Sequence, residues 1–392
     1  MTTTPHISDE QRRARLGRRH LLAPARRAAT AEEVADAVVG LHASDPATVH
    51  LAACARLAEP SAAEVDRALY EDVTLLKLLS MRRTLFAVTT EIAPYVYSST
   101  ARDIARRERA QMIKALARCE DPAEPWDEQR LARTEQATLQ ALAARGEATT
   151  AELGQDVPAL REQVIMSPGK PYEARRSVGS WVLGILAADG HVRRARPRGS
   201  WTSSLHRWAA ADALPELPAR EAKAALVRRW LASYGPSSEA DLKWWTGWSL
   251  RDTRAALADV GAVPVRLDHG PGLALPDDLE PVTADGDWAA LLPGLDPTSM
   301  GWRERDWYLA PEHVPFLFDR AGNIGPTVWW NGRIVGGWAQ HANGEIVWRA
   351  LEKLDRAATE AIEAETERLA AWLGEVRVTP RFRTPLEREL VR

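Results

Sequence analysis

"VGSWVLGILAADGHVRRARPRGSWTSSLHRWA" (residues 178–209) is the stretch of the chain that decides the predicted fold. Its first half is apolar and predicts a helix that ends at Asp189-Gly190, because glycine readily adopts the left-handed conformation that closes a helix. Its second half has two extended runs around Arg-Pro-Arg-Gly, a pattern typical of a β-hairpin. Upstream, residues 127–146 predict a long helix, and the hydroxyls that open "TTAELGQD" can cap a second, short helix. Three helices followed by a basic hairpin is the order of a winged helix.

The same order recurs before and after this stretch. In the later copy, three helical patterns cover residues 219–235, 237–247 and 249–261. Two strand-like runs around His-Gly-Pro-Gly follow over residues 262–275. The earlier copy is looser, with expected helices over 30–44 and 61–72 and a strand region over 75–90. The final third has β-rich runs that break at Asn331-Gly332 and Asn343-Gly344, which favour hairpin turns, followed by a closing helix.

The predicted fold class is therefore α+β, with three tandem winged-helix modules followed by a small, antiparallel, β-barrel-like C-terminal domain. The expected boundaries are 1–125, 126–215, 216–280 and 281–392.

Composition narrows the class of protein. The 392 residues are 45% hydrophobic and 27% charged, as in a globular chain, and no apolar run is long enough to predict a membrane span. Cys54 and Cys119 lack the spacing of a disulfide or metal motif, and no nucleotide-binding motif appears. We expect no metal, no cofactor and no secretory signal, and a monomer in the cytoplasm, associated with the nucleoid.

Positive charge is concentrated locally although the net charge is −3. The hairpin after residue 190 carries Arg193, Arg194, Arg196 and Arg198, and the strand region of the first copy carries Arg82 and Arg83. We expect these six arginines to contact the phosphate backbone of double-stranded DNA. The apolar helix before the hairpin has no Arg, Asn or Gln to read a base edge, so recognition of shape is favoured over sequence reading. Solvated hairpins, or winged helices that serve as protein-binding or structural modules, remain alternatives.

The stretch "GLHASDPATVHL" (residues 40–51) is the candidate catalytic segment. Asp45 can cap the next helix with Pro46 in its first turn, in which case His42 and Ser44 are ordinary loop residues. If the chain is extended there, however, both side chains project to the same side, because alternate residues of a strand share a face. Such a pair could hold one water molecule.

Several stretches in order along the chain resemble the AlkZ/YcaQ-type DNA glycosylases. They are "GLHASDPATVHLAACARL", "LLSMRRTLFAV", "DGHVRRARPRGSW", "YGPSSEADLKWWTGW", "LLPGLDPTSMGWRERDWYL" and "GPTVWWNGRIVGGWAQ". The resemblance implies tandem winged helices, binding to DNA, and repair of bulky alkylated purines. Active members carry a catalytic Gln-Φ-Gln or Gln-Φ-Asp, where Φ is apolar, and the matching positions here are His42 and Ser44 with Ala43 between them.

Three functions remain open at this point. The first is a monofunctional DNA glycosylase in which neutral His42 accepts a proton from water and Ser44 orients that water. The second is a protein that binds DNA damage or unusual DNA structure without catalysis. The third, a winged-helix transcriptional regulator, is disfavoured by the lack of base-reading side chains on the helix over 178–188.

Overall fold

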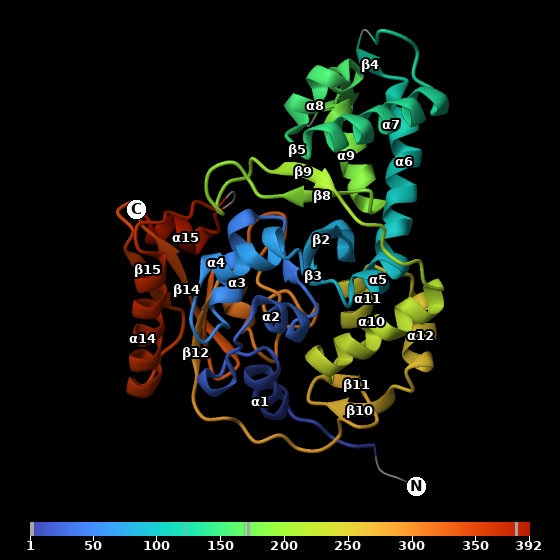
Figure 1. Cartoon of the computed structure of the whole chain (residues 1–392). Coiled ribbons are helices and arrows are strands. Elements are labelled where there is room, and N and C mark those ends of the chain that lie inside the picture. Colours follow the sequence, from blue (N-terminus) through green and yellow to red (C-terminus); the bar gives the residue numbers. More distant parts are fainter. Residues whose placement is uncertain (1–3, 121, 168, 171–172, 381–382) are drawn as a thin grey trace.

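The computed structural model describes residues 4–120, 122–167, 169–170, 173–380 and 383–392, which form a mixture of helices and small antiparallel sheets. Figure 1 shows the middle of the chain, from α6 to β9, as a lobe that projects from the rest of the molecule. This middle lobe has its own hydrophobic core, drawn only from residues 112–208. Another core joins the N-terminal part (residues 16–96), the third part (residues 226–275) and the C-terminal part (residues 288–386), so these three parts pack against one another. The N-terminal part also has a core of its own, drawn from residues 28–87.

The N-terminal part places the candidate catalytic segment on a three-stranded sheet of order β1-β3-β2. Its elements are α1 (Asp9–Arg19), η1 (Pro24–Arg26), α2 (Ala31–Ala37), β1 (Leu41–His42), α3 (Pro46–Cys54), α4 (Ala62–Asp66), η2 (Arg67–Glu71), β2 (Leu75–Leu79), η3 (Met81–Arg83) and β3 (Leu85–Thr89). The helix expected over 30–44 is too long, because it ends at Ala37. The chain turns at Gly40, whose φ is +109° and where a Cβ would lie 2.8 Å from a Val88 methyl group, so a side chain does not fit there.

The middle lobe contains the helices and hairpin predicted from residues 127–209. It is joined to the N-terminal part through α5 (Ala93–Val96), η4 (Tyr97–Ala101) and α6 (Arg102–Leu116), and continues with α7 (Glu128–Arg145), β5 (Glu147–Ala148), α8 (Thr150–Asp156), η5 (Pro158–Arg161), α9 (Val178–Ala188), β8 (Val192–Ala195) and β9 (Arg207–Ala210). Thr149 caps α8 through a capping box with Glu152. Sequence reasoning missed a second sheet, β4 (Cys119–Glu120), β6 (Gln163–Met166) and β7 (Ala174–Ser177).

The loop between β8 and β9 reaches back across the N-terminal part (Figure 1). Trp201 in this loop stacks on His50 of α3, with ring centroids 4.9 Å apart. It also stacks on Trp372 of α14 (Arg356–Leu373), with ring centroids 5.7 Å apart. Arg196 makes ion pairs with Asp66 at 2.6 Å and Glu71 at 2.8 Å. The middle lobe is therefore attached to the rest of the molecule at a second point besides α6.

The third part follows the predicted order of three helices and a hairpin. Its elements are α10 (Ala219–Tyr234), α11 (Glu239–Thr246), α12 (Leu250–Asp259), β10 (Val263–Leu267) and β11 (Gly270–Ala274). Ser238 caps α11 and Ser249 caps α12, as short polar side chains do at helix starts.

The C-terminal part is an open sheet of order β12-β13-β14-β15, which corrects the barrel-like domain expected from the sequence. Its elements are β12 (Ala289–Leu292), η6 (Pro311–His313), α13 (Val314–Leu317), β13 (Thr327–Trp330), β14 (Arg333–Gln340), β15 (Ile346–Ala350), α14 (Arg356–Leu373) and α15 (Pro385–Leu390). Both Asn-Gly turns lie between strands, as predicted. Four strands are too few to close on themselves around a filled interior, and α14 instead packs on β12.

Candidate active site

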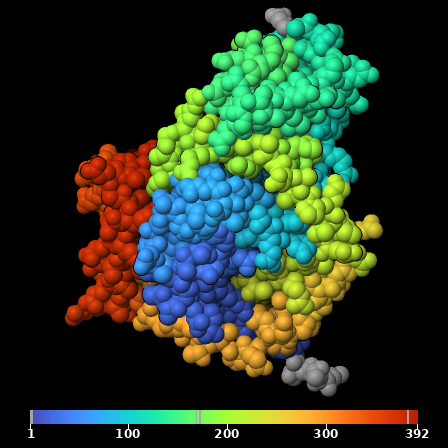
Figure 2. Space-filling view, in the orientation of Figure 1, coloured from blue at the N-terminus to red at the C-terminus, as the bar shows by residue number. Residues whose placement is uncertain are grey.

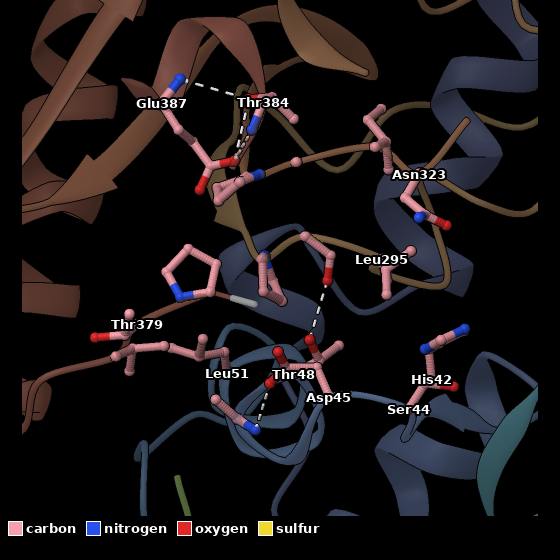
Figure 3. A pocket seen from close by; sticks show the side chains of 18 of the residues that line it. His42, Ser44, Asp45, Thr48, Leu51, Leu295, Asn323, Thr379, Thr384 and Glu387 are labelled. Atoms are coloured by element: carbon pink, nitrogen blue, oxygen red, sulfur yellow. Dashed lines mark hydrogen bonds between the residues drawn. The ribbon is translucent and has the colours of Figure 1, made fainter. Parts of the chain in front are cut away.

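His42 and Ser44 both line a pocket of about 710 Å³ between the N-terminal part and the C-terminal sheet. Figure 3 shows the two side chains next to each other at one end of the pocket, with Glu387 and Thr384 across from them. Thr48, on α3, donates a hydrogen bond to the carbonyl oxygen of Gly294 at 3.1 Å and so links the two walls. In the space-filling view, the segments that supply these walls, coloured blue and red, lie next to each other (Figure 2).

His42 is held in place by the sheet. It pairs with Phe86 of β3 in antiparallel register, and the two rings meet edge-on with centroids 5.3 Å apart. Burial, reinforced by the positive charge of Arg82, lowers the pKa of His42 to about 3, so the imidazole is neutral at physiological pH. Nδ1 is buried without a hydrogen-bond partner among the described residues. A neutral ring of this kind can accept a hydrogen bond from water but is a weak base.

Ser44 lies exposed just beyond the end of β1. Its hydroxyl oxygen accepts a weak hydrogen bond from the backbone N–H of Leu85 at 3.4 Å. Asp45 follows as the N-cap of α3 and accepts a hydrogen bond from the Ala47 N–H at 3.0 Å. This segment therefore caps α3 and also lines the pocket, so the two roles expected from the sequence are compatible.

The pocket lining has carboxylates but no lysine or arginine among the described residues. Asp319 accepts hydrogen bonds from its own turn, including the Asn323 side chain at 3.0 Å, and these bonds help to lower its pKa despite partial burial. Glu387 is buried and its pKa is raised by that burial, while one of its oxygens accepts hydrogen bonds from Thr384 N at 2.9 Å and Oγ1 at 3.0 Å. Asp45 is the third carboxylate.

Sequence reasoning missed the far wall of this pocket. Its residues come from β12 onwards; those labelled in Figure 3 are Leu295, Asn323, Thr379, Thr384 and Glu387. Part of this wall lies in the stretches "LLPGLDPTSMGWRERDWYL" and "GPTVWWNGRIVGGWAQ", which carry the family resemblance but had no role assigned to them. The capping pattern Thr384-x-x-Glu387 indicates a helix start rather than a site.

The six arginines predicted to contact DNA lie in different environments. Arg82 and Arg83 lie in the turn between β2 and β3; Arg83 pairs with Glu108, whereas Arg82 stacks on Trp244. In the hairpin, Arg196 and Arg198 are engaged in ion pairs within the chain. Arg193 and Arg194 have no ion pair among the described residues, although burial lowers the pKa of Arg194. The four hairpin arginines therefore do not form one free basic strip.

Asp296, whose role the sequence left open, anchors the C-terminal wall. It forms a fully buried, two-point ion pair with Arg56, with N–O distances of 2.9 and 2.7 Å. Arg56 also donates to the hydroxyl of Thr298 at 2.7 Å. This network fixes the loop after β12 against the end of α3.

The described residues contain no group of three or more His, Cys, Asp or Glu side chains that could hold a metal ion. No helix among them has the length and apolar character needed to cross a membrane.

Comparison with known proteins identifies the family to which this fold belongs. The family model described as DNA glycosylase AlkZ-like matches residues 35–372, so the chain belongs to the AlkZ-like DNA glycosylase family. The structure is similar to that of the Streptomyces sahachiroi DNA glycosylase AlkZ, with a TM-score of 0.72, 22% sequence identity, and coverage of 93% of this chain and 97% of that one. Among curated proteins, none matches.

Proposed function

We propose that this protein is a monofunctional DNA glycosylase that hydrolyses the N-glycosidic bond of bulky alkylated purines in double-stranded DNA. The observation that carries the proposal is the pairing of His42 and Ser44 on one wall of a pocket of about 710 Å³. A pocket of this volume lies within the range that accommodates small-molecule groups, so it has room for a purine with a bulky substituent.

The charge of the pocket supports this class of substrate. A purine alkylated at N7 or N3 is cationic, and a carboxylate attracts it by Coulomb interaction. Asp319 supplies such a carboxylate in the described lining. Apolar side chains such as Leu51, Leu295 and Trp338 offer surface to the alkyl group.

The proposed reaction needs little from the protein. The bond between C1′ and the purine nitrogen breaks, its electrons return to the cationic ring, and the base leaves as a neutral molecule. Water then forms a bond to C1′, and its proton passes to His42 or to solvent. Because water bonded to the cationic sugar is strongly acidic, a weak base suffices, which fits the lowered pKa of His42. Ser44 orients the same water.

The DNA-binding units belong to this proposal as well. We infer that α2 to β3, α7 to β9 and α10 to β11 are three winged helices, since each contains three α-helices followed by a hairpin. The apolar α9 is buried in the middle lobe and offers no base-reading side chain, which supports binding through backbone and shape.

The experiment uses the full chain and a duplex with one N7-alkylguanine. Abasic sites are measured as strand breaks after heat and alkali. The proposal expects release by the native protein and its loss in His42→Ala, with release retained in His341→Ala, because His341 lies outside the pocket lining. No release by the native protein would contradict the proposal.

A second function is favoured by one observation. A histidine with a pKa of about 3 is poorly suited to removing a proton from unactivated water. A protein that binds alkylated DNA without cleaving it would then show tight, damage-dependent binding in the same experiment but no abasic sites.

A further inference from the structure

Arg82 and Arg305, which the proposed reaction does not use, share one aromatic ring beside the pocket. The guanidinium carbon of Arg82 lies 4.1 Å from the centre of the Trp244 ring, and that of Arg305 lies 5.0 Å from it. Arg82 comes from the turn between β2 and β3, whereas Arg305 follows β12, so two distant segments bring the charges together.

Neither guanidinium has a negative partner in the described part of the chain. Arg82 and Arg305 form no ion pair there, and Arg82 donates only a long hydrogen bond, 3.4 Å, to the carbonyl oxygen of Met300. The Nε of Arg305 is buried without a hydrogen-bond partner, although its side chain also lies close to Tyr308. Burial and the charge of Arg305 lower the pKa of Arg82 to about 10. Two like charges held together in this way favour an anion between them.

The backbone of Arg82 is also unusual. Its φ is +53°, a left-handed conformation that is unfavourable for a non-glycine residue. Gly247 packs against this turn, and a Cβ there would lie 3.4 Å from the Arg82 nitrogen, in ordinary van der Waals contact. Non-glycine residues held in this conformation cluster at binding sites.

Neither arginine lines the pocket, but both lie near segments that do. Arg82 is close enough for its charge to lower the pKa of His42, and Thr84, two residues later, lines the pocket. Arg305 lies 5.4 Å from the centre of the Phe318 ring, and the next residue, Asp319, also lines the pocket. Two cations thus lie close to the lining, whereas the described lining itself has none.

We propose that Arg82 and Arg305 together bind one phosphodiester of the DNA strand, next to the nucleotide whose base enters the pocket. This proposal rests on the proposed function, since it assumes that the base enters this pocket. The planar guanidinium fork suits a phosphate that accepts two hydrogen bonds. A phosphate at this point would fix the sugar relative to His42, and it would also raise the pKa of His42 by offsetting the charge of Arg82.

The test measures binding of the full-length protein to a fluorescein-labelled duplex that contains a stable tetrahydrofuran analogue of an abasic site. Affinity is recorded by anisotropy at several salt concentrations, because each lost phosphate contact lowers the slope of log K against log salt by about 0.9. Arg82→Gln, Arg305→Gln and the double variant are compared with Arg220→Gln, an exposed arginine that is paired with Asp259. Thermal unfolding checks that each variant is folded.

If both arginines hold the same phosphate, each single variant and the double variant lose a similar slope, about 0.9. When the salt concentration is raised from about 50 to about 200 mM, binding by the variant weakens by a factor that is about 3.5-fold smaller than the factor for the native protein. Arg220→Gln leaves the slope unchanged. The proposal is overturned if the slope is unchanged in the variants. It is also overturned if the double variant loses about 1.8 from the slope, because that loss would indicate two separate phosphates.

A second measurement changes the DNA and compares the native protein with Arg82→Gln. Neutral methylphosphonate linkages are placed one at a time on either side of the abasic analogue, and one position is expected to weaken binding by the native protein but not by Arg82→Gln. If no position has this effect, the proposal is wrong. Binding is measured without base release, so failure here is distinct from failure of the proposed glycosylase activity.

Discussion

The burial of neutral His42 predicts a specific pH dependence of stability. Its pKa is about 3 in the folded protein and about 6.5 in an unfolded chain, so only the unfolded chain takes up a proton between these values. Stability from this residue is therefore fully present above pH 6.5 and is lost as the pH falls. Each pH unit below that point costs about 1.4 kcal/mol, which amounts to about 2.7 kcal/mol at a pH of about 4.5.

The assay compares the native protein with His42→Gln, which has no imidazole to titrate. The free energy of unfolding is measured with urea from neutral pH down to about pH 4.5, and the difference between the two proteins is plotted against pH. Other buried histidines, such as His20 and His50, contribute to both proteins and cancel in the difference. The native protein should lose about 2.7 kcal/mol relative to the variant over this range. A difference that does not change with pH would show that His42 is not held neutral by burial, and the reasoning would fail.

The remaining predictions concern the pocket and its supports. Ser44→Asp places a carboxylate beside the developing sugar cation, so base release should rise about tenfold, equivalent to about 1.4 kcal/mol, in single-turnover assays; a slower reaction would contradict the assigned position of the sugar. Asp296→Ala leaves the charge of Arg56 buried and unpaired, and urea denaturation should show a loss of about 3–5 kcal/mol, whereas a loss below 1 kcal/mol would refute the importance of this pair. Trp201→Ala removes two ring contacts and should lower the free energy of unfolding by about 2 kcal/mol in urea denaturation; a loss below about 0.5 kcal/mol would mean that the stack does not hold the hairpin in solution.

Much of the fold was predictable because local signals were strong. The apolar run of α9, the serine and threonine caps of α8 and α11, and the Asn-Gly turns around β14 all correspond to elements in the structure. These signals act within a few residues, so they need no knowledge of the tertiary structure. The helix over 30–44 was wrong because Gly40 packs against a strand that is distant in the sequence.

The candidate site was predictable only on one side. Alternation along the segment 42–44 indicated that His42 and Ser44 share a face, and both line the pocket. The opposite wall, with Asp319 and Glu387, depends on long-range packing of the C-terminal sheet, for which no local pattern exists. The ion pairs of Arg196 likewise depend on docking of the hairpin, so a basic composition alone overestimated its free charge.

The pocket has a consequence for protein synthesis. One wall comes from residues 42–51 and the opposite wall from residues 293–387. Because these two segments are far apart in the sequence, a ribosome makes the first wall long before the second, and the pocket forms only after the C-terminal sheet has been synthesised. Under the proposed function, a nascent chain therefore has no capacity for base excision until residue 387 has been added.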